Sequence, residues 1–464
     1  MPTCAIFPVI HSGGKTNMAT KPKPKPKSKT SAASSSARLN ELSASDAARA
    51  IASGRITSED LVRACLERIA EREPHVKAWA FLDPDLALAQ ARACDRQPWR
   101  GPLHGVPIAV KDVLDTADMP TGMGSAIFDG YQPKADAACV ALVRKAGAVI
   151  LGKTVTCELA GIAPRETMNP RDPKRTPGGS SSGSGAAVAD HMVPVAFGTQ
   201  TGGSVLRPAA FCGVIGYKPT YNTINRAGMK FAAEGVDTIG LIARSVDDVA
   251  LVTDACIDRP PAPLAALRTP PRIGLCRTYL WDSKASAETK TAVEAAAKRA
   301  EAAGARVTDF ALTEEFTRLT AIREVINNYE RACGLAWEWA HHRAKLSPQM
   351  TRTVEMGIAA PHSRYIEAVQ LAERCRGRLD DLMRDIDVLI APAVNGEAPL
   401  GLEHAGDPSF QSLWTLLHVP TISLPLATGP NGMPVGVQLV AKRWDDRGLL
   451  AAAKWMVLLP HGKA

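Results

Sequence analysis

The segment PGGSSSGSGAAVADHMVPVAFGTQTGGSVLRP, residues 177–208, decides how the rest of the sequence is interpreted. Two Gly-Gly-Ser triplets bracket it, one ending at Ser180 and the other at Ser204, with mostly small residues between them. Glycine pairs beside serine form loops in which backbone N–H groups can approach a ligand closely. The segment therefore predicts two serine-bearing loops joined by a helix over 186–195. Each loop can be a simple turn or can carry chemistry.

Short apolar runs and helical runs alternate on both sides of this segment. We expect helices over 58–72, 83–96, 138–146 and 288–303, and an almost wholly helical region over 314–386. Expected strands cover 106–110, 148–151, 214–215, 272–275, 387–391, 419–426 and 435–440. Such alternation favours an α/β fold, a single large domain with a central mixed, mostly parallel β-sheet covered by helices on both faces. The last strands lack a helical layer of their own, so we expect them to complete the same sheet.

The net charge of +8 arises mainly at the start of the chain. Residues 1–38 hold six lysines, Arg38 and no acidic residue, so the remaining residues are close to neutral. The repeat KPKPKPKSK cannot pack, so we expect a disordered Lys/Pro/Ser-rich leader over 1–38 and a folded domain over 39–464. A near-neutral domain does not favour nucleic acid as a partner. No apolar run is long enough to predict a membrane span.

The ten cysteines are scattered, and none forms a C-x-x-C pair. No secretory signal is evident in the sequence either. This pattern is typical of reduced thiols in a cytoplasmic protein, and it predicts neither a disulfide framework nor a zinc site. We expect no metal and no other cofactor.

Two common motifs match the sequence without a supporting context. Residues 147–154, GAVILGKT, fit the P-loop pattern, but the variable positions read as a strand whose N–H groups are used in the sheet. Residues 179–183, GSSSG, fit the nucleophile elbow of a Ser-His-Asp hydrolase around Ser181. Three prolines within 170–177 argue against the strand that such an elbow requires.

A third interpretation combines Lys111 with Ser180 and Ser204. Lys111 ends the apolar run VPIAV, where burial of its ammonium group is expected to lower the pKa. A neutral lysine can then remove the proton of a serine hydroxyl, which is otherwise a poor nucleophile. Each residue alone also fits a structural role, Lys111 as an exposed strand end and the two triplets as turns.

The conjunction of these segments resembles the amidase signature family. The similarity runs from about residue 39 to 455 and is carried by several unrelated segments in the same order. These are 101–112 (GPLHGVPIAVKD), 178–187 (GGSSSGSGAA), 198–204 (GTQTGGS), 208–219 (PAAFCGVIGYKP), 237–240 (DTIG), 419–425 (VPTISLP) and 432–440 (GMPVGVQLV). The resemblance implies the α/β fold of that family and an amidohydrolase that acts on linear amide C–N bonds.

The resemblance also implies a Ser–cis-Ser–Lys triad. Ser204 would be the nucleophile that forms an acyl-enzyme, and Ser180, after a cis peptide bond from Gly179, would pass a proton between Ser204 and Lys111. Ser181 would support Lys111 by hydrogen bonding. The oxyanion hole would be formed by the backbone N–H groups of Thr201, Gly202, Gly203 and Ser204.

The residues after Ser204 differ from the common family pattern. Many members carry arginine two residues after the nucleophile, whereas here Leu206 stands there and Arg207 follows it. This GGSVLRP arrangement resembles malonamidase-type bacterial amidases, in which the corresponding arginine holds the substrate carboxylate. An arginine fork suits a carboxylate, so we expect Arg207 to bind a small amide acid, unless Arg207 is structural. The same resemblance implies a homodimer.

Three alternatives keep the same sequence features. The chain could be the amidase subunit of a glutamyl-tRNA(Gln) amidotransferase, which shares the triad but works with partner subunits. It could hydrolyse carbamates or ureas on the same triad. It could also be a binding protein of the same fold without activity. The main hypothesis is an amidase whose only partners in the reaction are a small-molecule amide and water.

Overall fold

The computed structural model describes residues 38–460, and these contain an eleven-stranded sheet. The predicted leader over 1–38 lies outside the described residues except for Arg38. The strands are β1 Trp79–Leu82, β2 Pro107–Lys111, β3 Val149–Thr154, β4 Val195–Gln200, β5 Ile215–Lys218, β6 Thr238–Ala243, β7 Arg272–Leu275, β8 Arg306–Asp309, β9 Val388–Pro392, β10 Thr421–Thr428 and β11 Pro434–Val440. Their order in the sheet is β1-β3-β2-β4-β6-β5-β10-β11-β9-β7-β8. The prediction that the last strands complete the first sheet is confirmed, because β10 and β11 lie in its middle.

The sheet is mixed, but the prediction that it is mostly parallel is wrong. Among the described strands, six neighbouring pairs are antiparallel and four are parallel. The antiparallel pairs dominate the centre, where β10 and β11 are joined by a short turn and no helix lies between β5 and β6. Parallel strands need a crossover connection, usually a helix, and these connections do not provide one.

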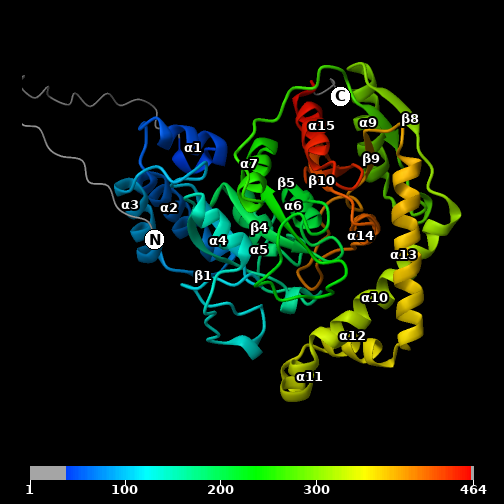
Figure 1. Ribbon diagram of the computed structural model, residues 1–464, viewed down its shortest axis with the longest axis horizontal. Coiled ribbons are helices and arrows are strands. Elements are labelled where there is room, and N and C mark those ends of the chain that lie inside the picture. Colours follow the sequence, from blue (N-terminus) through cyan, green and yellow to red (C-terminus); the bar gives the residue numbers. More distant parts are fainter. Residues whose placement is uncertain (1–37, 461–464) are drawn as a thin grey trace, which may run out of the picture. The chain divides into compact units, whose positions relative to one another are not determined.

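Helices cover both faces of the sheet (Figure 1). The longer helices are α1 Ala44–Ala52, α2 Ser58–Val76, α3 Pro84–Arg96, α4 Ala138–Lys145, α5 Ser182–Ala189, α7 Val246–Cys256, α9 Ala287–Ala302, α10 Leu319–Gly334, α12 Pro348–Ala359, α13 His362–Leu382, α14 Ser409–Leu416 and α15 Asp446–Leu458. The shorter ones are α6 Leu206–Cys212, α8 Trp281–Lys284 and α11 Ala336–His342. No helix within residues 38–460 is long and apolar enough to cross a membrane.

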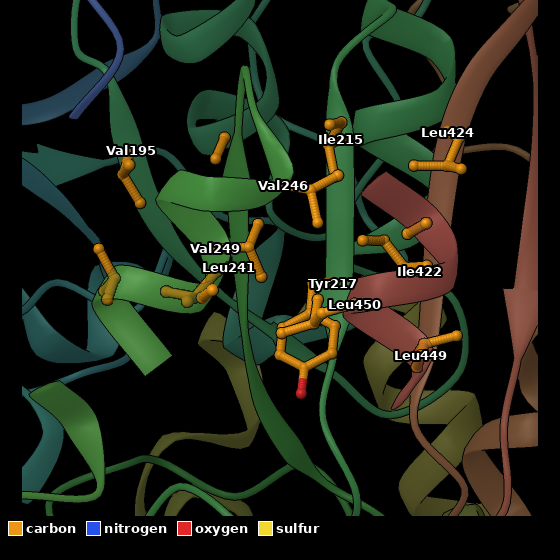
Figure 2. Packing of buried hydrophobic residues seen from close by; sticks show 14 of the residues in the cluster. Val195, Ile215, Tyr217, Leu241, Val246, Val249, Ile422, Leu424, Leu449 and Leu450 are labelled. Atoms are coloured by element: carbon orange, nitrogen blue, oxygen red, sulfur yellow. The ribbon is translucent and has the colours of Figure 1, made fainter. Parts of the chain in front are cut away.

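Alternate residues of each strand face two different cores. On one face, Val195 and Leu241 belong to the same core as Val249 of α7 and Leu450 of α15 (Figure 2). On the other face, Ile242 of β6 joins residues of α2, α3, α5 and α6 in a second core. The period-two alternation of the strands thus produces a layered helix–sheet–helix architecture, as the sequence predicts.

Helix α5 starts earlier and ends earlier than the predicted helix over 186–195. It consists of small residues, and a Cβ on Gly183 would stand 2.2 Å from the backbone oxygen of Ala78. A Cβ on Gly185 would likewise stand 3.0 Å from Pro208 of α6. The small residues therefore let α5 lie close to β1 and α6, and this close packing fixes the loops at both ends of the 177–208 segment.

The helical region predicted over 314–386 contains α10 to α13, and α10 packs closely on α12. A Cβ on Gly357 of α12 would stand 1.9 Å from the backbone oxygen of Asn328 in α10. Alanine normally stabilises a helix interior relative to glycine by up to about 1 kcal/mol. Here we expect Gly357→Ala to destabilise the protein by about 1–3 kcal/mol, because the helices must separate.

Chemical denaturation of the two variants Gly357→Ala and Gly377→Ala tests this packing. Gly377 lies in α13 and a Cβ there would meet no atom within 4 Å, so Gly377→Ala is the matched control and is expected to be neutral or stabilising. Equal stability of the two variants would contradict the close contact between α10 and α12.

Candidate active site

Lys111 and the first Gly-Gly-Ser loop meet at the end of strand β2. Lys111 is the last residue of β2, which runs parallel to β4, so its side chain lies beside the end of β4. Its Nζ lies 2.7 Å from Ser180 Oγ and 2.8 Å from Thr199 Oγ1. The peptide bond between Gly179 and Ser180 is cis. Sequence reasoning brought Lys111 and Ser180 together but missed Thr199.

Lys111 is held in a site that favours its neutral form. The side chain is fully buried, and none of the ion pairs formed among the described residues involves it. Burial lowers the pKa of Lys111 from 10.5 to about 7, and the nearby guanidinium groups of Arg207 and Arg331 act in the same direction. Near neutral pH a large fraction of Lys111 can therefore accept a proton.

Ser181 supports this arrangement through Thr199. The backbone N–H of Thr199 donates to Ser181 Oγ at 3.3 Å, and the Ser181 hydroxyl donates to the Thr199 carbonyl at 3.4 Å. The backbone N–H of Ser181 also donates to the Ser204 carbonyl at 3.2 Å. Ser181 thus joins the two Gly-Gly-Ser loops and is placed to position Thr199 against Lys111.

The second loop presents Ser204 and a series of free backbone donors. Ser204 is buried, with 7% of its surface exposed, but it lines a cavity, whereas Ser180 is fully buried. In the described part of the chain, the N–H groups of residues 201–204 donate to no backbone acceptor. Gln200 Oε1 instead accepts from the N–H groups of Val205 and Leu206, which braces the loop. The N–H groups of Thr201, Gly202, Gly203 and Ser204 are thus unpaired with the described backbone, as an oxyanion hole requires.

Asp237 holds the first residue of this loop. The Thr201 hydroxyl donates to Asp237 Oδ1, and Oδ2 accepts from the N–H of Ala233 at 2.9 Å. Burial raises the pKa of Asp237 above its ordinary value, against the hydrogen bonds that lower it. Residues 237–240 are one of the segments that resemble the family. In this structure their first residue, Asp237, holds the loop that carries Ser204 through its hydrogen bond with Thr201.

Arg207 lies beside the site, and main-chain oxygens occupy two of its nitrogens. Its Nη1 donates to the Gly406 carbonyl and its Nη2 to the Gly179 carbonyl, both at 2.6 Å. Arg207 is 3% exposed, and burial lowers its pKa from 12.5 to about 10. Its Nε has no hydrogen-bond partner among the described residues. Arg207 therefore has the structural role considered as an alternative in the sequence analysis, because it holds the Gly179 carbonyl by a hydrogen bond.

A small cavity opens beside Ser204 and is lined by three arginines. Its volume is about 60 Å³, and Arg207, Arg323 and Arg331 all reach it. Arg323 and Arg331 come from α10, so part of the helical region predicted over 314–386 lines the cavity. Sequence reasoning missed both, because nothing local distinguishes an arginine on an amphipathic helix that faces a site from one that faces solvent.

The residues of the P-loop match and of the G-x-S-x-G match have structural roles. The P-loop match at 147–154 contains strand β3, whose residues are paired with β1 and β2. Ser181 of the G-x-S-x-G match precedes α5 but is hydrogen-bonded to Thr199. Within residues 38–460 no cluster of three or more His, Cys, Asp or Glu residues could hold a metal ion.

Comparisons with known proteins identify the family. The sequence matches the family described as Amidase over residues 60–450. It is 36% identical to one subunit of the glutamyl-tRNA(Gln) amidotransferase of Oleidesulfovibrio alaskensis, over 88% of this chain and 95% of that relative. A crystal structure of an amidase aligns with a TM-score of 0.83 and 30% identity, over 90% of this chain and all of that one. The peptide amidase from Stenotrophomonas maltophilia aligns with a TM-score of 0.78 and 29% identity, over 90% of this chain and 96% of its own.

The chain therefore belongs to the amidase signature family. It is an enzyme of the group that acts on amide C–N bonds, as amidases and amidotransferases do. The family comprises both kinds of protein, so membership alone does not choose between them.

Proposed function

We propose that the protein cleaves the amide C–N bond of a small molecule through an acyl-enzyme on Ser204. The observation that carries this proposal is the contact between the buried Lys111 and Ser180, next to a loop that combines Ser204 with free backbone donors. Neutral Lys111 takes a proton through Ser180 as Ser204 Oγ attacks the carbonyl carbon. The negative charge on the carbonyl oxygen is stabilised by the N–H groups of 201–204, each worth roughly 3 kcal/mol in the transition state.

The second half of the reaction returns the enzyme to its starting state. The tetrahedral intermediate collapses as Lys111 gives its proton back through Ser180 to the nitrogen, which leaves as ammonia or an amine. Water then attacks the acyl-enzyme, its proton passing to Lys111 by the same relay, and Lys111 returns that proton through Ser180 to Ser204 Oγ as the carboxylic acid is released. No step requires a group outside this chain other than the substrate and water. Carbamates and ureas fit the same steps.

A fluorophosphonate probe tests the nucleophile directly. We expect one covalent adduct per chain, and peptide mapping by mass spectrometry should place it on Ser204, because Ser204 lines the cavity and its loop is joined through Ser181 to the loop that carries the Lys111 partner Ser180. Denatured protein is the control and should not react. An adduct on another serine, or no adduct on the folded protein, would contradict the proposal.

The second candidate is the glutaminase subunit of an amidotransferase. The similarity to the glutamyl-tRNA(Gln) amidotransferase chain over 88% of this one supports it, and that chemistry would use the same serine and the same relay. Ammonia released from glutamine would then pass to an acceptor bound by partner subunits. Purification with partner subunits, together with glutamine-dependent amidation of glutamyl-tRNA, would support this candidate. Isolation of the chain alone, with hydrolysis of free amides, would count against it.

The sequence comparisons support the second candidate better, whereas the cavity beside Ser204 favours the first. Glutamine carries an α-carboxylate and an α-ammonium group, and each needs a counter-charge when it is buried. The residues that line the described cavity include three arginines but neither aspartate nor glutamate. The cavity therefore suits the carboxylate of an amide acid better than the ammonium group of glutamine. Homodimerisation and a cytoplasmic location stay predictions.

A further inference from the structure

We propose that the cavity beside Ser204 is a carboxylate subsite centred on Arg323, which selects small amide acids that lack an amino group. This inference rests on the proposed amide cleavage at Ser204 and names the substrate class of that site. It assigns the main contact with the carboxylate to Arg323 of α10, whereas the sequence pattern suggested Arg207.

Arg323 is half-buried and donates to no other described residue, whereas Arg207 has only its Nε unpaired. A Cβ on Gly202 would stand 3.2 Å from Arg323 Nη2, so the guanidinium lies directly beside the Ser204 loop. Its Nε is buried and has no hydrogen-bond partner among residues 38–460. Burial lowers the pKa of Arg323, while Glu324 and Asp407 act against this shift from a distance. A guanidinium group that is buried with unused donors is best satisfied by a bidentate anion.

Arg207 and Arg331 add positive charge, but some of their N–H groups already donate to main-chain carbonyls. Arg207 donates to the carbonyls of Gly406 and Gly179, and Arg331 Nη1 donates to the Leu159 carbonyl at 3.1 Å. Burial also lowers the pKa of Arg331 to about 10. Main-chain carbonyls fix the two guanidinium groups without neutralising them, so the cavity keeps a strong positive potential.

Among the carboxylates that act on the three arginines, Glu324 is exposed on α10, and the others accept hydrogen bonds from other groups, although Glu158 Oε2 has no partner among the described residues. Asp407 accepts hydrogen bonds from Lys284 and Ser409, Asp237 accepts from Thr201 and backbone N–H groups, and Glu158 accepts from the N–H of Ser347. None of these acids lines the cavity. The positive charge around Ser204 is therefore left for a ligand.

The size of the cavity limits the acid to a short one. Its volume of about 60 Å³ is well below the roughly 300–1,000 Å³ of pockets for drug-sized ligands. The lining also includes Asn327, Ser347 and Thr353, which are neutral and can complete hydrogen bonds to a carboxylate but supply no charge for an ammonium group. A short amide acid such as succinamate fits these conditions, and asparagine, which differs from it only by the α-ammonium group, does not.

Steady-state hydrolysis of three matched amides tests the subsite. Butyramide replaces the carboxylate of succinamate with a methyl group, and asparagine adds the ammonium group. We expect the wild-type kcat/KM for succinamate to exceed those for butyramide and asparagine at least about tenfold. Arg323→Gln should lower kcat/KM for succinamate about 10- to 100-fold and change that for butyramide less than about threefold. Arg323→Lys should restore part of the preference.

The control for lost charge is Arg352→Gln, because Arg352 is exposed on the neighbouring helix α12 and lies outside the cavity lining. It should behave as the wild type towards all three amides. Wild-type hydrolysis of butyramide as fast as succinamate would overturn the proposal. An equal loss on both substrates in Arg323→Gln and Arg323→Lys would also overturn it, since that result indicates a structural role.

Binding of succinate separates this inference from the proposed function. Calorimetry on the Ser204→Ala variant should detect succinate binding, weakened at least about tenfold when Arg323→Gln is added. If the wild type hydrolyses no amide but succinate still binds in an Arg323-dependent manner, the subsite stands and the proposed function fails. If amides are hydrolysed but succinate does not bind, the subsite fails and the proposed function stands.

Discussion

Ser204→Ala should reduce amide hydrolysis at least roughly 10⁴-fold, because the variant has no atom that can form the acyl-enzyme. The loop itself should keep its shape, since Gln200 braces it through the N–H groups of Val205 and Leu206 and not through the Ser204 hydroxyl. Ammonia release from the best substrate is the measurement, with thermal unfolding to show that the variant is folded.

A serine from the same glycine-rich segment provides the control for Ser204→Ala. Ser182 Oγ has only a 3.4 Å contact with the Val155 carbonyl, and Ser182 takes no part in the proposed relay. Ser182→Ala should therefore keep its rate within a few-fold of the wild type. A Ser204→Ala variant that is folded and keeps more than about one hundredth of the rate would refute the nucleophile assignment.

Lys111→Met should lower the rate roughly 10²- to 10⁴-fold, the range that general-base catalysis contributes. Methionine fills a similar buried volume but accepts no proton. In the wild type, the proton acceptor is neutral Lys111, whose pKa is lowered to about 7. The rate should therefore rise as pH increases through about 7 and fall about tenfold per pH unit below it. In Lys111→Met this dependence should disappear.

A second buried lysine makes the comparison specific. Burial also lowers the pKa of Lys218 to about 7, but its Nζ donates to the carbonyls of Pro219 and Val419 and lies outside the site. Lys218→Met should lower stability, because two buried carbonyls lose their donor, and should leave the pH dependence of the rate in place. If Lys218→Met lost the pH dependence of the rate and Lys111→Met kept it, the titrating group would be Lys218. That result would contradict the proposed relay through Lys111.

Local sequence was sufficient where the chemistry depends on short segments. The strand end at Lys111 and the two Gly-Gly-Ser triplets are each readable within a few residues, and the structure brings Lys111 and Ser180 into contact. Arg323 and Arg331 lie in a long helical region, and only the packing of α10 against the Ser204 loop distinguishes them from surface arginines. Thr199 was missed for a different reason, because its hydroxyl and carbonyl act through the fold of strand β4 beside β2.

The antiparallel pairing of the central strands could also not be predicted from the alternation of strands and helices in the sequence. Alternating strands and helices predict parallel pairing, but this holds only where each connection crosses the sheet. The connection over 219–237 contains no helix, and β10 turns directly into β11. Helix α5 differs from its predicted range because the tertiary contacts of Gly183 and Gly185, and not hydrophobic periodicity, decide where it lies.

The place of β10 and β11 in the sheet has a consequence for synthesis of the protein. These strands connect β5, on the side made first, with β9, which pairs with β7, and β7 in turn pairs with β8. A nascent chain that ends before Thr421 therefore holds two partial sheets, each with an open edge and neither joined to the other. The complete sheet can form only after Val440 has left the ribosome, so the two partial sheets keep an unpaired edge each until nearly the whole chain has been made.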